Sequence, residues 1–123
     1  MATIYVDAGE AIVVDLIDGT SAVHLDATNA KVAWGTGAGV AAKADTTLFT
    51  EASEARVTAT RSQPVADKIR WVGTITANAT KTITNAGNFT ASAAGTLIVH
   101  GDHAGQALVS GDKIEYTIDL EIT

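Results

Sequence analysis

The stretch Lys113–Thr123, KIEYTIDLEIT, decides the fold class of this chain of 123 residues. Apolar side chains occupy every even position from Ile114 to Ile122, and polar or charged side chains occupy every odd position. Because side chains on a β-strand point to alternate faces, this pattern predicts a strand with one face in a core and one face in water. Ser110-Gly111-Asp112 supplies a turn signal just before it.

Similar alternation recurs along the chain, most clearly in Ile69–Ala79, which we expect to be the longest central strand, with a bulge at Gly73. Shorter strands are expected at residues 2–6, 10–18, 31–34, 55–60, 81–84 and 95–100. Seven or eight strands at this spacing predict an all-β fold, a single-domain β-sandwich over residues 1–123 that is Ig-like or jelly-roll-like. The expected core contains Trp71, Ile75, Ile114, Tyr116, Ile118 and Leu120.

Residues 10–18, EAIVVDLID, fit two structures. Apolar positions from Ile12 to Ile17 match one face of a helix, and Gly19 would end that helix. The β-branched content favours a strand instead. We expect a strand, because the surrounding sequence is rich in strand signals.

Several weakly patterned segments predict loops. Residues 1–9 are expected to be a flexible N-terminal arm, and residues 35–43 a loop, with one or both ordering against a neighbouring subunit or a partner surface. Pro64 is expected to break the strand that precedes it. Asn85–Asn88 is interpreted as a turn and residues 101–106 as a loop.

The composition limits the classes of partner. The chain carries 14 acidic and 8 basic residues, a net charge of −6, with no basic run, so no nucleic-acid partner is expected. The absence of cysteine excludes disulfides and thiolate metal sites. The N-terminus lacks the pattern of a signal peptide, and no apolar run is long enough to span a bilayer, so no membrane partner is expected.

His100-Gly101-Asp102-His103 places two imidazoles and a carboxylate within four residues, and both groups are competent metal ligands. His24 and Asp26 form a second, weaker pair. A metal site needs further ligands that the sequence cannot place. We interpret the first segment as a polar turn between strands and predict neither a metal nor a cofactor, while binding of a metal by His100, Asp102 and His103 stays open at this level.

Two further segments are weighed against known catalytic motifs. Gly35–Gly39 lacks the sixth-position glycine and the lysine of nucleotide-binding loops, so we interpret it as a flexible turn. Ser110 lies near His103 and Asp112 in sequence, but no nucleophile elbow surrounds it. We therefore predict no catalytic residues and expect that the chain is not an enzyme.

Charged and aromatic residues receive structural interpretations as well. Glu51 and Glu54, close to Arg56, are interpreted as a solvated charge cluster. Trp34 and Trp71 lie on the apolar sides of alternating strands and are expected in the core, with stacking on a sugar or base as the alternative.

The order of several segments resembles a pattern in small structural proteins of tailed bacteriophages. The segments are KVAWGTG at 31–37, ADTTL at 44–48 with Glu51, Glu54 and Arg56 after it, WVGT at 71–74, TITNAGNF at 82–89, GTLI at 95–98 and SGD at 110–112. Together they cover about three-quarters of the chain. The chain departs from the pattern at Asn85, where the group is expected to have an acid, so a salt bridge there is not carried over.

The resemblance implies a β-sandwich assembled on a virus particle, as a capsid decoration (cement) protein, and it implies no enzyme. It also implies binding to the major capsid protein of the virion and self-association, with a trimer favoured because closed oligomers match capsid symmetry axes. The implied location is the virion, after synthesis in the host bacterial cytoplasm.

Two other functions compete with this one. A phage tail or fibre domain that binds a host surface glycan would show an exposed tryptophan beside Asp or Asn at a loop end. A metal-dependent enzyme would use His100, Asp102 and His103.

Overall fold

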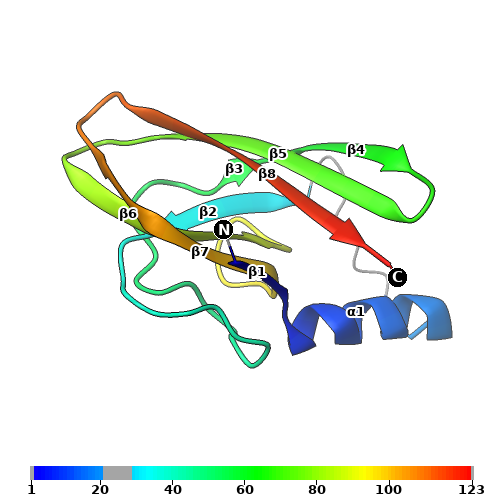
Figure 1. Ribbon diagram of the computed structural model, residues 1–123. Helices are drawn as coiled ribbons and strands as arrows, with labels where there is room; N and C mark the ends of the chain where they lie inside the picture. The colour runs from blue at the N-terminus through cyan, green and yellow to red at the C-terminus, as the bar shows by residue number, and fades with distance from the viewer. Residues whose placement is uncertain (1, 21–28, 123) are drawn as a thin grey trace.

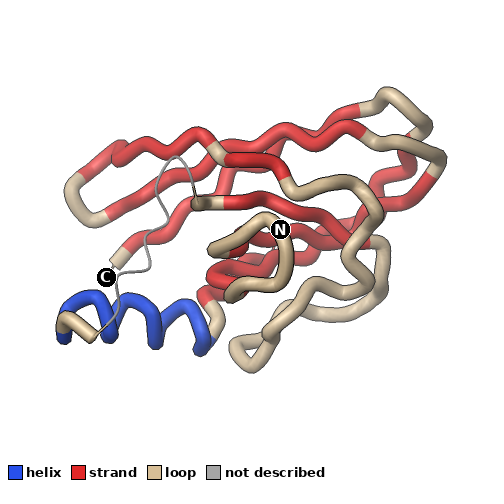
Figure 2. The backbone as a smooth tube through the Cα atoms, turned by 180° about the vertical axis from the view of Figure 1, so that it is seen from behind, coloured by secondary structure: helices blue, strands red, loops and turns tan. Residues whose placement is uncertain are grey.

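In the computed structural model, which describes residues 2–20 and 29–122, the chain forms two antiparallel β-sheets and one short helix (Figure 1, Figure 2). Sheet A has the strand order β1-β7-β6-β2-β3, and sheet B has the order β4-β5-β8. The predicted all-β sandwich is confirmed. The elements are β1 (Ala2–Tyr5), α1 (Asp7–Asp18), β2 (Lys31–Gly35), β3 (Val57–Thr58), β4 (Thr60–Val65), β5 (Lys68–Thr76), β6 (Lys81–Phe89), β7 (Leu97–Leu108) and β8 (Lys113–Glu121).

The main core lies between the two sheets and contains Trp34 of β2 and Trp71 of β5, each with 1% of its surface exposed. The expected position of both tryptophans in the core is confirmed. Of the other predicted core residues, three are buried and two are half-buried against the same core: Ile75, Tyr116 and Ile118, then Ile114 and Leu120.

β8 has the register that its alternation predicts. It pairs with β5 without a shift, from Lys68 opposite Glu121 to Thr76 opposite Lys113. The predicted bulge at Gly73 is therefore wrong. A Cβ atom at Gly73 would lie 3.0 Å from Cβ of Val32, so the glycine is needed for the close approach of sheet A.

The prediction of a strand at residues 10–18 is wrong, because this segment belongs to α1. The helix ends at Gly19, whose φ of 81° is the left-handed conformation that glycine adopts readily. Asp7 and Glu10 lie in the first turn, where the helix dipole favours acids. Ile12 packs against the main core, so burial of one helical face outweighs the β-branched composition.

The segment predicted to be a flexible N-terminal arm is part of the fold from residue 2 onward. β1 pairs with β7 over its whole length. Val6 is fully buried, and its N–H donates to the carbonyl of Ile98 at 3.0 Å. The segment is ordered because β7 offers a strand edge with which this short apolar segment can pair.

The turn predicted at Asn85–Asn88 and the loop predicted at residues 101–106 are both wrong, because β6 and β7 run through these segments as paired neighbours. β7, with 12 residues, is longer than β5, which has 9 residues and contains most of the segment expected to be the longest central strand. Both asparagines are fully buried inside sheet A. Asn85 donates to the carbonyl of Phe49 and Oδ1 of Asn88 accepts from the N–H of Val99, which supports a turn-like sequence as a strand, although Nδ2 of Asn88 has no partner among the described residues.

The break expected at Pro64 is also corrected. The strand expected at residues 55–60 is divided between β3 and β4, and β4 continues through the proline. β4 lies at the edge of sheet B, and its pairing with β5 shifts between Ser62 and Val65. An irregular edge is where a strand tolerates a residue without an N–H group.

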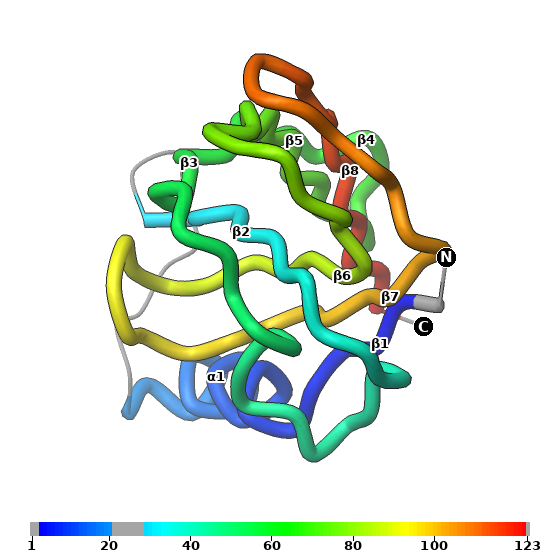
Figure 3. The backbone as a smooth tube through the Cα atoms, turned by 90° about the vertical axis from the view of Figure 1, so that its left-hand side faces the viewer, coloured from blue at the N-terminus to red at the C-terminus, as the bar shows by residue number. Residues whose placement is uncertain are grey.

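Residues 36–56, here called the connection, cover the outer face of sheet A, the face turned away from sheet B (Figure 3). A second apolar core lies beneath the connection, so sheet A is buried on both faces. Its buried members are Val6, Ala33, Leu48, Phe89 and Leu97.

Candidate functional site

The most concentrated polar chemistry of the described residues lies between sheet A and the connection. His100 of β7 is fully buried. Its Nδ1 lies 2.7 Å from Oδ2 of Asp45, and its Nε2 lies 3.1 Å from Oδ1 of Asn85. Its ring packs on Phe49, with 4.7 Å between ring centroids. The histidine therefore ties the connection to two neighbouring strands of sheet A.

The two ring nitrogens of His100 have fixed partners. Phe49 fixes the orientation of the Asn85 amide, because its N–H donates to Oδ1 and its carbonyl accepts from Nδ2, each at 3.0 Å. An amide oxygen thus faces one ring nitrogen of His100, and the Asp45 carboxylate faces the other. Both ring nitrogens of His100 are therefore engaged by side chains of the fold, and neither is left to ligate a metal.

The interpretation of His100-Gly101-Asp102-His103 as a polar turn is wrong, because all four residues lie in β7. Strand geometry also separates the three candidate ligands. Asp102 shares the outer face with His100 and accepts from the N–H of Ala41 at 2.9 Å, whereas His103 points between the sheets toward Tyr116. Within residues 2–20 and 29–122, no three His, Cys, Asp or Glu side chains are placed to hold a metal.

The glycine segment Gly35–Gly39 is not a flexible turn, as was predicted, but a packed, extended segment. Gly35 forms a bridge with Glu51, and the N–H of Gly37 donates to the carbonyl of Phe49 at 2.9 Å. A Cβ atom at Gly35 would lie 2.4 Å from that carbonyl oxygen. These glycines are required by the close approach of two backbone segments.

The predicted solvated charge cluster divides into two ion pairs, one partly exposed at Glu51 and one buried at Glu54. The guanidinium of Arg56, whose side chain is 8% exposed, forms two bonds of 2.9 Å with the carboxylate of Glu51. It also lies 3.6 Å above the ring of Phe89 and donates to the carbonyls of Ala91 and Ala94. Arg56 therefore clamps the connection to the turn between β6 and β7.

Glu54, the other acid of this group, has a side chain that is only 6% exposed. Its Oε2 accepts from Nζ of Lys81 at 2.8 Å and from Nε1 of Trp34 at 3.2 Å. Burial acts to raise the pKa of this carboxyl, but the bonds from Lys81 and Trp34 outweigh burial and hold the pKa below its usual value. Glu54 is thus an ionised structural group and a poor general acid.

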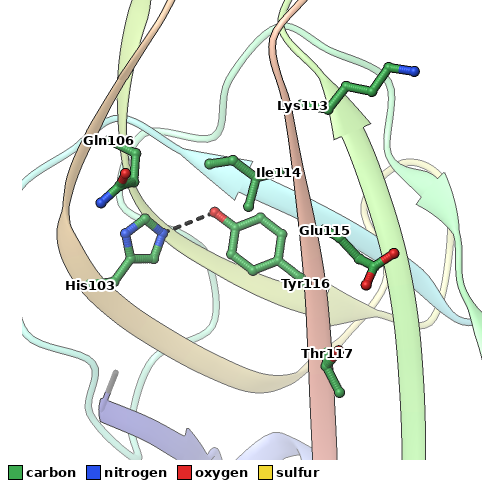
Figure 4. A pocket seen from close by; sticks show the side chains of 7 residues that line it. All are labelled: His103, Gln106, Lys113, Ile114, Glu115, Tyr116 and Thr117. Atoms are coloured by element: carbon green, nitrogen blue, oxygen red, sulfur yellow. Dashed lines mark hydrogen bonds between the residues drawn. The ribbon is translucent and has the colours of Figure 1, made fainter.

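A shallow groove of about 510 Å³ opens between the second half of β7 and β8, with His103 and Tyr116 at its centre (Figure 4). The Tyr116 hydroxyl lies 2.9 Å from Nε2 of His103, and Nδ1 of His103 lies 2.8 Å from the carbonyl of Ala104. Because a carbonyl only accepts, Nδ1 carries the proton and the hydroxyl donates to Nε2. Burial raises the pKa of Tyr116, so its hydroxyl keeps its proton and is poorly suited to proton abstraction.

Among the residues that the structure describes, no hydrolase triad forms at Ser110. Both ring nitrogens of His103 are engaged with other partners, and Asp112 accepts from the N–H of Val109 at 2.9 Å to close the turn before β8. The second candidate pair, His24 and Asp26, lies outside the described residues.

Sequence reasoning missed the residues that pair with the candidates. Asn85 was assigned to a turn, and Phe49 and Lys81 were not singled out. Asp45 and His100 meet although 55 positions separate them. Asp45 also stabilises a short turn of the connection, because its Oδ2 accepts from the N–H of Ala42 at 2.8 Å.

Comparisons of the chain with protein-family models, with curated proteins and with solved structures found no match. None of the helices formed by the described residues has the length and apolar character needed to cross a membrane. The function must therefore be inferred from the chain's own chemistry.

Proposed function

We propose that this chain is a non-enzymatic structural protein of a phage virion, which binds and stabilises a capsid lattice as a decoration (cement) protein. Its proposed partners are the major capsid protein and further copies of itself, with a trimer favoured by the resemblance. Neither nucleic acid nor a membrane is a proposed partner. The proposed location is the virion, after synthesis in the bacterial cytoplasm.

The observation that carries this proposal is that the side chains capable of chemistry are engaged in holding the fold together. His100 and Glu54 join the connection to strands of sheet A, and Arg56 joins it to the turn between β6 and β7. Buried polar groups with all partners in place make a surface segment rigid and unique in conformation. A rigid surface supports a role in a lattice, because less conformational freedom is lost when it binds.

The glycan-binding alternative depends on an exposed tryptophan. Both tryptophans of the chain are 1% exposed, so neither ring is available for stacking on a sugar. The metal-enzyme alternative depends on ligands that lie on opposite faces of β7. Neither alternative therefore gains support from the residues that motivated it.

The test is co-sedimentation of the full chain with expanded empty capsids of its own virus. We expect saturable binding, with the number of bound copies set by the number of lattice sites. Capsids of an unrelated virus serve as the control. A protein that stays in the supernatant at micromolar concentration, while a glycan array captures it, would contradict the proposal.

A further inference from the structure

β8 lies at an edge of sheet B. Its hydrogen-bond pattern with β5 shows which of its backbone groups point away from the sheet. Backbone bonds at the two ends of the ladder join Ala77 to Asp112 and Ile122 to Asp67, so even-numbered residues of β8 bond to β5. In an antiparallel pair of strands, residues that bond to the partner strand alternate with residues whose N–H and C=O groups point away from that partner. The odd-numbered residues of β8 therefore present free donors and acceptors, and no backbone group of the described residues bonds to them.

This edge lacks the protection that the other edge of sheet B has. β4 contains Pro64 and a register shift, whereas β8 runs for 9 residues without proline, glycine or shift. Across the groove, the edge of β7 that faces away from β6 pairs with no strand of the described residues after Asp102, where pairing with β1 ends. A long, regular edge strand is a template for pairing with another strand.

We propose that β8 of one copy pairs antiparallel with β8 of a second copy about a two-fold axis, which joins the two B sheets into one continuous sheet. In this register Lys113 lies opposite Asp119 of the second copy, and Glu115 lies opposite Thr117. Tyr116 lies on the axis.

Charge and hydrogen-bond phase select this register. Odd residues must pair with odd residues, because only these present their N–H and C=O at the edge. Registers centred one or two residues beyond Tyr116 place Glu115 opposite an acid, which is unfavourable across strands. The register centred on Tyr116 places Lys113 opposite Asp119 twice and sets no like charges directly opposite each other.

The groove on this side of the sandwich also fits a second copy. The two-fold axis places Tyr116 opposite Tyr116 of the second copy, on the inner face of the joined sheet. The two residues form a non-hydrogen-bonded pair, in which the Cα atoms lie about 4.5 Å apart. Each ring then covers part of the other copy's groove, which is about 510 Å³ in volume and open to solvent. The Tyr116 hydroxyl keeps its bond to His103. One contact thus closes both the backbone edge and the groove.

This inference goes beyond the capsid proposal and does not rest on it. A contact that uses the same surface on both copies closes at two, so it predicts a dimer in place of the trimer that the resemblance favours. A dimer can form whether or not the protein binds capsids. Sedimentation of the protein alone and co-sedimentation with capsids therefore separate a failure of one proposal from a failure of the other.

Sedimentation of the full chain, from micromolar to near-millimolar concentration, tests the pairing. We expect a concentration-dependent dimer that Thr117→Pro weakens by at least about tenfold, because proline removes an N–H that points to the free edge and not to β5. Thr117→Val keeps that N–H and is the matched control, with a dimer like that of the native chain. Circular dichroism verifies the fold of each variant. A monomer at every concentration, a trimer, or a dimer indifferent to Thr117→Pro overturns the proposal.

Lys113→Glu tests the register without changing the backbone. Lys113 is exposed, and its replacement sets two acids opposite each other at both symmetric positions, so we expect a dimer about tenfold weaker. Arg61→Glu makes the same change of charge on exposed β4 and should leave the dimer intact. If both variants weaken the dimer equally, or if Lys113→Glu does not weaken it, Lys113 does not lie opposite Asp119 and the proposed register is wrong.

Discussion

The two flanks of this sandwich differ in how their polar groups are used. On the closed flank, the outer face of sheet A, His100 holds the connection through its bond to Asp45, and Arg56 holds it through bonds to the carbonyls of Ala91 and Ala94. On the open flank, β8 and the second half of β7 each have one edge without a strand partner among the described residues. The closed flank therefore specifies one conformation, while the open flank leaves backbone N–H and C=O groups free to bond to a further strand.

The largest effect is expected where β8 is held to the rest of the fold. Ile118 is 4% exposed, and Ile118→Ala should lower the free energy of unfolding by about 2–5 kcal/mol through lost burial and a cavity. Ile122 lies just beyond β8 and is 57% exposed, so Ile122→Ala should cost less than about 0.5 kcal/mol. Urea unfolding measures both. Similar costs for the two variants would show that the inner face does not anchor the open flank.

The closed flank is tested by removal of its clamp. Arg56→Ala should lower the free energy of unfolding by about 2–3 kcal/mol, less than for a fully buried pair because the Glu51 side chain is 33% exposed. Arg61 is exposed, and Arg61→Ala should change stability by less than about 0.5 kcal/mol. Equal costs in urea unfolding would show that the closed flank is not held by Arg56.

Limited proteolysis adds a local measurement for Arg56→Ala. Cleavage within the connection should rise while sheet B stays protected, because the lost bonds lie within the connection or join it to the turn between β6 and β7. Uniform protection of the connection would contradict the role of the clamp.

The sequence predicts the open flank better than the closed flank. The period-two pattern of β8 is local, so its strand, register and buried face follow from neighbouring residues alone. Asn85 instead has the composition of a turn and becomes a strand residue because Phe49 and His100 satisfy its amide. Those partners meet only in the folded chain, so no local pattern predicts them.

α1 shows the same limit from another side. Its β-branched residues predict a strand on local propensity, whereas Gly19 and the spacing of apolar residues predict a helix. The structure follows the spacing, because Ile12 can then pack on the main core. Propensity is a weak preference that tertiary burial overrides.

The smallest expected effect is the loss of stability of the folded chain at alkaline pH, which involves a tyrosine of the open flank. Tyr116 lines the open flank, and burial raises its pKa above the usual value of 10.0. Above about pH 10 the unfolded chain loses a proton that the folded chain keeps, so the stability that Tyr116 contributes is complete below that pH and declines as pH rises. We expect a loss of about 1 kcal/mol between about pH 10 and 11 in the native chain, and a flatter profile in Tyr116→Phe.

Tyr5 provides the matched control for this pH dependence. Burial, and then the charge of Glu10, raise the pKa of Tyr5 as well, but this tyrosine is only half-buried. Tyr5→Phe should therefore flatten the alkaline profile less than Tyr116→Phe does. Because Tyr116→Phe also removes the hydroxyl that donates to His103, the slopes of stability against pH are compared and not the absolute stabilities. Urea unfolding gives each slope, and tyrosinate absorbance reports which ring ionises in the folded chain. If the two variants flatten the profile equally, Tyr116 is no more protected from solvent than Tyr5, and the inner face of the open flank is wetter than its side-chain packing indicates.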